Sequence, residues 1–295
     1  MSNRRDIKRR ITSVQNTKKI TKAMEMVAAA RLRRAAQRIE ATRPYALHMT
    51  EFIAGMAVHV EVDTERFPLL EQHEEVRRVA VVALTADRGL CGAFNSNIVR
   101  TAQQYMRTCR GESVEVDLIV VGKKGAGTFR FQHQAVAGSY LGITDKPTFL
   151  DAQSIANRLA ELYTRRRVDR VVLIFNHFVS AIEQRVTEQV ILPIQEEVVT
   201  EYAPSATAPH LDFEFEPSAE AILNQLLPSY LEMAVYRALL ESTASEHGAR
   251  MTAMRNASES AGEMIDTLTL AMNRARQASI TQEILEVVAG ADALS

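Results

Sequence analysis

The sequence predicts an α/β fold in which long N- and C-terminal helices form an antiparallel coiled coil and a small Rossmann-like α/β domain is inserted between them. Three observations carry this prediction. Apolar residues recur at helical spacing near the N-terminus, short β-branched apolar runs occupy the middle, and helical spacing returns towards the C-terminus. The expected divisions are residues 1–60 for the N-terminal coiled-coil helix, 75–195 for the α/β domain, 196–217 for a connector and 218–295 for the C-terminal coiled-coil helix.

The N-terminal helix is predicted from an apolar stripe whose members mostly fall three or four residues apart, the spacing of one helix face. The stripe consists of Ile7, Ile11, Val14, Ile20, Met24, Val27, Ala28, Leu32, Ala35 and Ile39. It drifts around the helix, as expected for a long helix that winds about a partner. Pro44 lacks a backbone N–H, so we expect a kink or interruption there before the pattern resumes from Tyr45 to about Val60.

The middle of the chain is predicted to form a mostly parallel sheet. The runs 79–84, 116–121 and 171–175 are short, continuous and rich in β-branched residues, which suits strands covered by helices on both faces. Helical patterns separate them, so their order is β-α-β-α-β. Residues 184–191 are expected to add an edge strand.

The C-terminal helix is predicted from a coiled-coil seam with alternating spacings of three and four residues. The seam residues are small for a coiled coil: Leu240, Ala244, His247, Met251, Met254, Ser258, Ala261, Ile265, Leu268, Met272, Ala275 and Ser279. A continuous helix from Tyr230 to Leu294 would be about 95–100 Å long, more than the core of a globular protein of this size can use. We therefore expect the two terminal helices to pair as a rod, with the α/β domain at one end.

Charge is distributed unevenly along the chain. The formal net charge is −1, yet residues 1–43 hold nine arginines and four lysines against only three carboxylates. Such a basic arm indicates an acidic partner. The arm has no aromatic residue for stacking on bases, and its apolar stripe requires burial against a helix, so an acidic protein surface is favoured over nucleic acid.

Cysteine usage and hydropathy restrict the remaining classes. Cys91 and Cys109 provide neither a disulfide framework nor metal-ligand spacing, so a reducing compartment is expected. No apolar run approaches the roughly 18 residues of a membrane span. The Arg-rich N-terminus lacks the apolar core of a signal peptide, and we interpret it as mature protein.

Two glycine-containing turns have the outward features of enzyme sites. DRGLCGAFN follows the first predicted strand and contains Gly89, Cys91 and Gly92, but it matches neither a dinucleotide fingerprint nor a P-loop, and no base is ordered to activate Cys91. A tight turn with a small buried thiol is favoured. VVGKKGAGTF, residues 120–129, combines three glycines with two lysines at a spacing that fits no nucleotide motif, so a strand-to-helix turn is favoured over a phosphate site.

The segment Thr267–Gln282 is nearly uncharged. Arg274 and Arg276 are its only charged residues, among hydroxyl, amide and small side chains. A surface helix normally carries more charge than this, so the segment suits a shaft that is enclosed by other subunits.

ITQEILEVVAGADAL, residues 280–294, resembles the C-terminal signature of the γ subunit of F-type ATP synthases. The positions of that pattern are occupied by Ile280, Thr281, Glu283, Glu286, Gly290 and Ala291. NRARQASIT, SEHGARMTAMRNAS, RGLCGAFN and the N-terminal RRITSVQNTKKITKAMEMVAAARL are also similar to that subunit. The resemblance therefore covers effectively the full chain.

The resemblance implies a central rotor stalk. In that family the coiled coil lies inside a hexamer of α and β subunits, and the α/β foot sits with the ε subunit on the membrane ring of c subunits. Proton flow turns the ring and the stalk, which drives the catalytic β subunits through the conformations of ATP synthesis or hydrolysis. It also implies that this chain has no catalytic residue, no cofactor or metal, and no direct membrane insertion.

The resemblance also carries over individual contacts. Met24 lies near the region where the shaft acts on β. Four residues match the family's polar contacts between shaft and β: Arg276, Gln277, Thr281 and Glu283. Glu25 departs from the basic or polar residue expected beside Met24, and the loop Gly89–Gly92 is expected to offer a surface to ε or the c ring.

Regulation and location follow from the same resemblance. Chloroplast relatives carry an inserted cysteine pair that acts as a redox switch, whereas the connector here is short and has no cysteine, so no such switch is expected. The N-terminus favours a bacterial protein, peripheral on the cytoplasmic face of the plasma membrane. The alternative is an α/β nucleotide-binding enzyme with coiled-coil dimerisation arms, which predicts that the isolated chain binds nucleotide or turns over a substrate.

Overall fold

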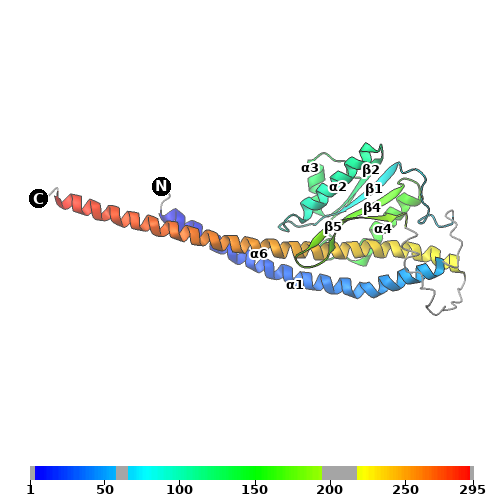
Figure 1. Ribbon diagram of the computed structural model, residues 1–295, viewed down its shortest axis with the longest axis horizontal. Helices are drawn as coiled ribbons and strands as arrows, with labels where there is room; N and C mark the ends of the chain where they lie inside the picture. The colour runs from blue at the N-terminus through cyan, green and yellow to red at the C-terminus, as the bar shows by residue number, and fades with distance from the viewer. Residues whose placement is uncertain (1–3, 58–65, 195–217, 293–295) are drawn as a thin grey trace. The chain divides into compact units, whose positions relative to one another are not determined.

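The computed structural model describes residues 4–57, 66–194 and 218–292, so the predicted connector at 196–217 lies outside the described residues. The fold is the predicted mixed α/β arrangement with a long helix at each end (Figure 1). The chain divides into two compact units: the first comprises Met1–Ala28 and Arg250–Ser295, and the second comprises Ala29–Ala249. These units cut through both long helices, whereas the predicted divisions follow the ends of elements.

The two long helices are α1 (Arg4–Ala57) and α6 (Ala219–Asp292). Helix α1 continues through Pro44, so the interruption considered there does not occur. Met49 and Ile53, which follow Pro44, are buried in the core of the second unit. This packing stabilises the end of α1 despite the hydrogen bond that proline cannot make.

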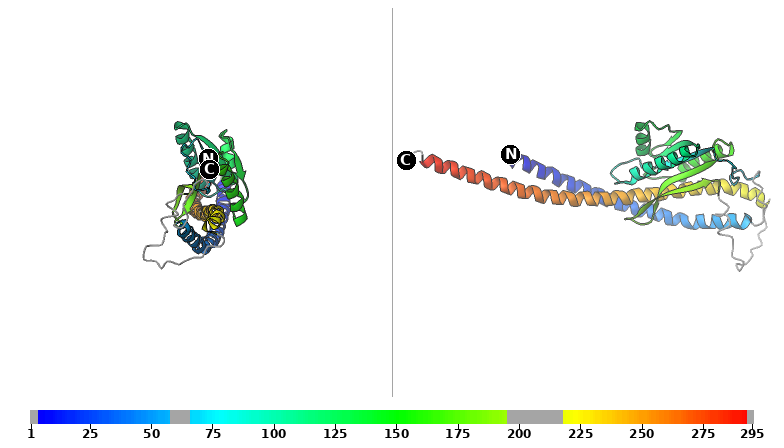
Figure 2. Two further views of the ribbon diagram at one scale, coloured as in Figure 1. Left: turned by 90° about the vertical axis from the view of Figure 1, so that its right-hand side faces the viewer. Right: turned by 45° about the horizontal axis from the view of Figure 1, so that its top comes forward.

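In the first unit, the start of α1 lies beside α6, and the C-terminal end of α6 extends beyond the start of α1 (Figure 1 and Figure 2). Glu25 pairs with Arg255, while the Lys18 side chain lies against Gly262. Residue numbers therefore rise along one helix as they fall along the other. The pair is antiparallel, as predicted.

The second unit is built on a five-stranded sheet with the order β3-β2-β1-β4-β5. Its strands are β1 (Arg78–Leu84), β2 (Glu115–Val121), β3 (Gly138–Tyr140), β4 (Arg170–Phe178) and β5 (Gln184–Leu192). The first four are parallel, and β5 pairs antiparallel with β4 as the predicted edge strand. Strand β3 was not predicted, because a three-residue Gly-Ser-Tyr strand presents no apolar run.

Helices cover both faces of the sheet in the second unit. The helices between the strands are α2 (Phe94–Gly111), α3 (Lys123–Phe131) and α4 (Phe149–Thr164). Val79 and Val81 of β1 point into the core beneath α2 and α3, whereas Ala80 and Val82 point into the core formed with α4 and parts of α1 and α6. A strand whose two faces are both covered by helices must be apolar at every position, and this explains the continuous apolar runs in the sequence.

Candidate functional site

The helix pair of the first unit is closed by the predicted seam of small side chains. On α6, Met254, Ser258 and Ala261 are buried, and the seam positions from Ile265 to Ala275 are half-buried. Ser279, the last predicted seam residue, is exposed. The seam prediction is therefore confirmed as far as Ala275.

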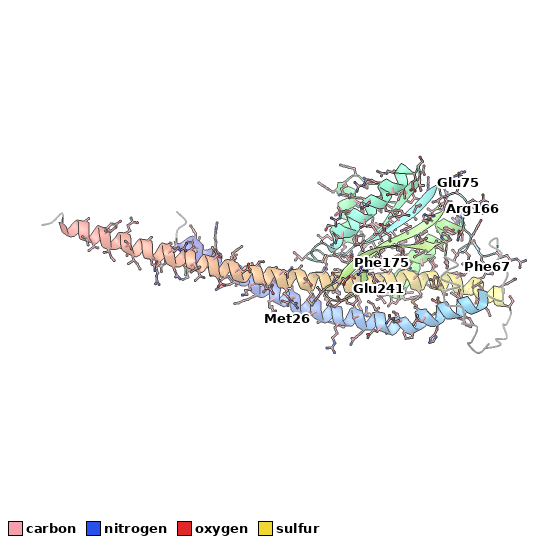
Figure 3. The ribbon with its side chains drawn as sticks, viewed as in Figure 1. Met26, Phe67, Glu75, Arg166, Phe175 and Glu241 are labelled. Atoms are coloured by element: carbon pink, nitrogen blue, oxygen red, sulfur yellow. The ribbon has the colours of Figure 1, made fainter. Side chains whose placement is uncertain are left out.

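On α1 the predicted stripe is wrong at two positions. Ile20 and Val27 are 61% and 54% exposed, and the buried positions of this stretch are Thr21, Glu25 and Ala28. Apolar spacing alone could not reveal this. Thr21, Glu25 and Ala28 are also three or four residues apart, and polar side chains can take such positions when a polar partner faces them. Ile20 and Val27 instead present apolar surface to the solvent, as does nearby Met26 (Figure 3).

Glu25 occupies the seam because both of its carboxylate oxygens are paired. Lys22 Nζ donates to Oε2 at 3.0 Å, and Arg255 Nε donates to Oε1 at 3.2 Å. The hydrogen bond from Lys22 lowers the pKa of Glu25 and, together with that from Arg255, outweighs the opposing effect of burial. Glu25, which the resemblance led us to expect as a basic or polar residue of another kind, therefore links the two helices of the first unit.

The five predicted contacts with β subunits all belong to the first unit. Met24 is half-buried, while Arg276, Gln277, Thr281 and Glu283 are exposed on α6. Ser279 Oγ donates to Glu283 Oε1 at 3.2 Å.

Apolar side chains are exposed around these polar residues at the end of α6. They are Ile280, Ile284, Leu285, Val287 and Val288. Four of them fall at the i, i+4, i+7 and i+8 spacing of one helix face. Exposed apolar surface of this kind marks an interaction site. The described end of α6 therefore has the chemistry of a contact surface.

The turn after β1 contains the second group of predicted residues. Gly92 has φ +56°, and Leu90, which is not a glycine, has φ +63°. Gly89 lies outside the left-handed region, and a Cβ there would make only ordinary contact with the Lys124 side chain. Of the two glycines in this turn, the backbone conformation thus favours glycine at Gly92 and not at Gly89.

Cys91 in this turn is 2% exposed. Its sulfur accepts a hydrogen bond from Asn95 Nδ2 at 3.1 Å, and the Asn95 Oδ1 atom accepts one from Ala86 N at 2.8 Å. The thiol is part of the packing beneath the start of α2. This arrangement suits the predicted buried thiol rather than a nucleophile, which must reach its substrate.

Asp87 joins three segments at the carboxyl ends of β1, β2 and β3. Its Oδ1 atom accepts hydrogen bonds from Lys123 N at 3.0 Å and Gly142 N at 2.8 Å. Its Oδ2 atom accepts from Thr144 N at 3.0 Å and from Thr144 Oγ1 at 2.9 Å. Burial raises the pKa of the Asp87 carboxyl, but these hydrogen bonds outweigh it and lower the pKa below its ordinary value.

The glycine-rich turn before α3 is explained by the same packing. A Cβ on Gly122 would lie 2.3 Å from Thr85 O, and one on Gly125 would lie 2.4 Å from Thr85 Oγ1. The first backbone N–H of α3, that of Lys123, is the kind of group that would bind a phosphate, but it already donates a hydrogen bond to Asp87. The glycines permit close approach to Thr85, and the chain's own carboxylate takes the position of a phosphate.

The stretch of α6 from Glu241 to His247, of which the seam prediction named only Ala244 and His247, is buried on every side. Glu241 Oε1 accepts from Arg237 Nε at 2.8 Å, and Oε2 contacts His177 Nδ1 of β4. Figure 3 shows Glu241 near Phe175 of β4, and both residues line one cleft of about 320 Å³. Sequence periodicity found only the two seam positions of this stretch, because a helix covered on all sides has no exposed face to set a period for the others.

Two hydroxyl groups in this stretch join α6 to the sheet. Thr243 Oγ1 donates to Thr144 O, and Ser245 Oγ donates to Asn176 O, each at 3.0 Å. The polar side chains of the stretch thus bind the loops and strand ends around them. Their role in the second unit is to position α6.

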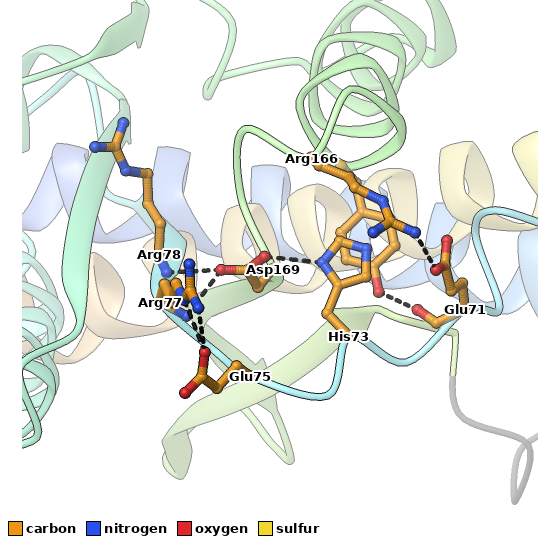
Figure 4. A network of polar contacts seen from close by, with 8 residues as sticks. Glu71, His73, Glu75, Arg77, Arg78, Arg166 and Asp169 are labelled. Atoms are coloured by element: carbon orange, nitrogen blue, oxygen red, sulfur yellow. Dashed lines mark hydrogen bonds and ion pairs between the residues drawn. The ribbon is translucent and has the colours of Figure 1, made fainter.

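A further polar network lies at the opposite edge of the sheet, where β1 and β4 begin (Figure 4). Asp169 Oδ2 accepts from the backbone N–H groups of Arg77 and Arg78, each at 2.8 Å, and Oδ1 lies 2.9 Å from His73 Nδ1. The His73 ring stacks on Tyr163 with centroids 4.8 Å apart. Burial raises the pKa of Asp169, but its hydrogen bonds with His73 and the two amides outweigh this and lower it. The groups satisfy one another, which is the arrangement of a structural network.

The described residues contain neither a metal-ligating cluster nor a membrane-spanning helix. Within residues 4–57, 66–194 and 218–292, no three His, Cys, Asp or Glu side chains converge as a metal site. In the same part of the chain, no helix has a stretch that is both long and apolar enough to cross a membrane.

The first unit is an antiparallel helix pair with an exposed apolar end. The second unit contains an α/β sheet whose glycine turns are filled by its own side chains. Together these features define a coiled-coil protein with an inserted α/β domain. Comparison with known proteins identifies the family. The model of the ATP synthase family matches residues 3–294. The chain is 44% identical over 295 residues to the ATP synthase gamma chain of Rubrobacter xylanophilus, covering 100% of this chain and 99% of that one. It is 45% identical over 294 residues to the gamma chain of Moorella thermoacetica, covering 100% of each. The chain belongs to the ATP synthase gamma chain family.

Solved structures agree with this assignment. The central stalk and c-ring structure of the Tetrahymena thermophila mitochondrial ATP synthase contains a chain with a TM-score of 0.62 and 30% identity, covering 81% of this chain and 99% of that one. A chain of the Euglena gracilis mitochondrial ATP synthase has a TM-score of 0.69 at 18% identity, covering 99% of this chain and 94% of that one, and shows the shared fold. The alternative of a nucleotide-binding enzyme is not favoured by these relatives.

Proposed function

We propose that this chain is the central rotor stalk of an F-type ATP synthase. The chain couples proton-driven rotation of a c-subunit ring to the conformational changes of catalytic β subunits during ATP synthesis or hydrolysis. The proposal is carried by the family match, which extends over residues 3–294 and so includes both helices of the first unit and the whole α/β sheet. Its partners are α and β subunits around the shaft, an ε subunit and the c ring.

The exposed end of α6 is the surface that we assign to the α and β subunits. The apolar side chains from Ile280 to Val288 require cover that the described residues do not give them. A sleeve of other subunits supplies that cover without fixing one orientation, because apolar contact is not directional. A rotor needs this property, since deep binding in one orientation would stop rotation.

Polar contacts give the shaft its grip on individual β subunits. We assign this role to four residues of α6: Arg276, Gln277, Thr281 and Glu283, and we place Met24 of α1 near the region where the shaft acts on β. All four are exposed and their side chains are available to acceptors and donors of a partner. The basic arm of α1 supplies reversible attraction to acidic surface on β.

We further propose that the turn from Gly89 to Gly92 belongs to the surface that meets ε or the c ring. Cys91 is too deeply buried to take part, so the contact falls to its exposed neighbours Leu90 and Gly92. The chain itself carries out no catalysis and binds no nucleotide for catalysis in this proposal. It is bound peripherally at the cytoplasmic face of a bacterial plasma membrane.

Truncation tests the proposal. The full chain, or a chain ending at Asp266, is co-expressed with α and β subunits of a bacterial ATP synthase, and the purified complex is assayed for ATP hydrolysis. The full chain is expected to form an active complex, and loss of Thr267–Ser295 is expected to impair assembly or coupling. The proposal fails if the full chain forms no active complex, or if the truncated chain assembles and couples as well as the full chain.

A further inference from the structure

A cleft in the second unit is lined by three arginines of the basic arm, for which the rotor proposal gives only a general attraction to acidic protein surface. Its volume is about 310 Å³, and it lies between α1, α6 and the loop that precedes α4. Helix α1 contributes Arg31, Arg34 and Arg38, and the loop contributes Asp145 and Lys146. All of these residues belong to the second unit.

The charges in this cleft do not cancel. Asp145 is the only carboxylate among the described residues of the lining, and it is paired with Arg31. Over the described part of the chain, no ion pair joins Arg34, Arg38 or Lys146 to a carboxylate. Three cations therefore face a concave site without a counter-ion from the described residues.

The arrangement of the arginines suits one bound anion. Arg31, Arg34 and Arg38 fall at i, i+3 and i+7 of α1, which places them along one face of the helix. Between them Ala35 is buried, and Leu240 of α6 is buried opposite. Cations grouped over an apolar floor concentrate positive potential in the cleft more than the same charges would on a flat surface.

We propose that this cleft binds a compact polyphosphate anion, either free pyrophosphate or the phosphate chain of a nucleotide. The planar guanidinium group pairs with phosphate oxygens through two parallel hydrogen bonds, so an arginine-lined cleft matches phosphate chemistry. The volume is at the lower end of the range for small-ligand pockets, about 300–1,000 Å³, and favours a small anion over a peptide segment. The inference does not depend on the rotor proposal, and it differs from the enzyme alternative because the cleft contains neither glycine turn, 89–92 or 122–127, and no turnover is expected in it.

The lining also indicates how a nucleotide would be held. No Phe, Tyr or Trp is among the described residues that line the cleft, and the one ring there, the His247 imidazole, belongs to a side chain that is 2% exposed, so a base has no open ring face to stack on. Affinity is therefore expected to come from the phosphate groups and to be the same for different bases.

Calorimetric titration of the full chain with sodium pyrophosphate tests the site. The Arg34→Gln/Arg38→Gln variant removes two cations of the lining, whereas Arg33→Gln/Arg43→Gln removes two exposed cations of the same helix outside it. Each charge-assisted hydrogen bond is worth about tenfold in affinity, so the first variant is expected to bind about a hundredfold more weakly. The pyrophosphate affinity of the control variant is expected to stay within about threefold of the wild-type value, because the control changes only the screened, longer-range electrostatic field. Absence of one-to-one binding to the wild-type chain, or equal losses in both variants, overturns the proposal.

A change in the opposite direction separates binding from damage to the fold. Asp145→Asn removes the one carboxylate of the lining and frees Arg31, so pyrophosphate affinity is expected to rise about tenfold. Glu40→Gln, which removes an exposed carboxylate of α1 outside the lining, is expected to leave affinity within about threefold. Weaker binding by Asp145→Asn would contradict the proposed electrostatics.

Titrations with ATP, GTP and a hexaglutamate peptide identify the source of the anion. Equal affinities for ATP and GTP, with displacement by pyrophosphate, are the expected result for a site that reads phosphate alone. A strong preference for ATP that Arg34→Gln/Arg38→Gln abolishes would contradict the base-independent site. Binding of hexaglutamate without binding of pyrophosphate would overturn the proposal and assign the cleft to an acidic protein partner.

Discussion

Asp87→Asn is the substitution whose effect on the second unit follows most directly from the structure. The Asp87 carboxylate accepts four hydrogen bonds, from Lys123 N, Gly142 N, Thr144 N and Thr144 Oγ1. An asparagine in the same position keeps one acceptor oxygen. Its Nδ2 donor would face Thr144 N, so two donors would meet.

The cost can be placed within a range. A hydrogen bond to a charged group contributes about 1.5–3 kcal/mol, and the substitution removes at least one and weakens the others by removing the charge. Water can reach the partly exposed loop and replace some of the lost interaction. We therefore expect the free energy of unfolding of the second unit to fall by about 3 kcal/mol at pH 7.

The effect has a defined pH dependence. Because the folded-state pKa of Asp87 lies below its ordinary value of 3.8, its carboxylate stabilises the fold fully above that value. The contribution is lost as the pH falls through the lower, folded-state pKa. The difference between wild type and Asp87→Asn should accordingly narrow at pH values below about 4.

Urea unfolding by circular dichroism measures the loss, and hydrogen exchange locates it. Exchange should accelerate in the segments 123–131 and 138–144, which contain the amides that Asp87 binds. Asp117→Asn is the matched control, because this half-buried carboxylate has no hydrogen bond or ion pair within the described residues. Equal stability losses in the two variants, or unchanged exchange in both segments, would refute the reasoning.

The remaining predictions concern packing and partner contacts. Gly125→Ala should destabilise the second unit by about 2–3 kcal/mol in thermal or urea unfolding, because its Cβ would overlap buried atoms. Gly127→Ala, in the same helix, meets no atom within 4 Å and should instead stabilise α3 by roughly 0.5–1 kcal/mol. Cys91→Ser should retain ATP hydrolysis of the assembled complex, because the thiol is packed in a turn and has no chemical role in this account. Arg276→Ala/Gln277→Ala should weaken assembly or coupling while leaving the nucleotide affinity of β unchanged, as measured by proton-driven ATP synthesis and nucleotide titration.

Each of these predictions has a contrary result. Gln104→Ala/Arg107→Ala removes the same two residue types from exposed positions of α2 and serves as the control for the double variant. Equal rates of ATP synthesis by both double variants and the wild type would show that Arg276 and Gln277 do not make the assigned contacts. Destabilisation by the two glycine substitutions alike would show that overlap with Thr85 is not the cause, and loss of hydrolysis in Cys91→Ser would give that thiol a role.

Much of the fold could be predicted because its signals are local. The strands β1, β2 and β4 are continuous apolar runs, since helices cover both sheet faces, and the α6 seam repeats at a fixed spacing as far as Ala275. The strand β3 was missed because it is three residues long and gains its stability from pairing with β2. That pairing joins residues that no local pattern connects.

The errors in α1 and in the turn after β1 have a common cause. Glu25 is buried in place of an apolar neighbour because Arg255, distant in sequence, faces it. Leu90 adopts a left-handed conformation that the sequence would assign to glycine, and Gly89 does not. In both places tertiary contacts decide which residue takes the special position. The candidate contact residues of α6 were identified only through the resemblance. They are exposed polar residues at a helix end, and no spacing in the sequence distinguishes such residues from other exposed ones.

Direct observation of rotation is the measurement that tests the rotor proposal most closely. Phe131 at the end of α3 is 85% exposed, so Phe131→Cys provides a labelling site, while Cys91 and Cys109 are buried. A probe attached there is followed in single complexes whose α and β subunits are fixed to a surface. The account predicts rotation in one direction that starts with ATP and stops without it. A complex that hydrolyses ATP at its normal rate while the probe stays still would contradict the account.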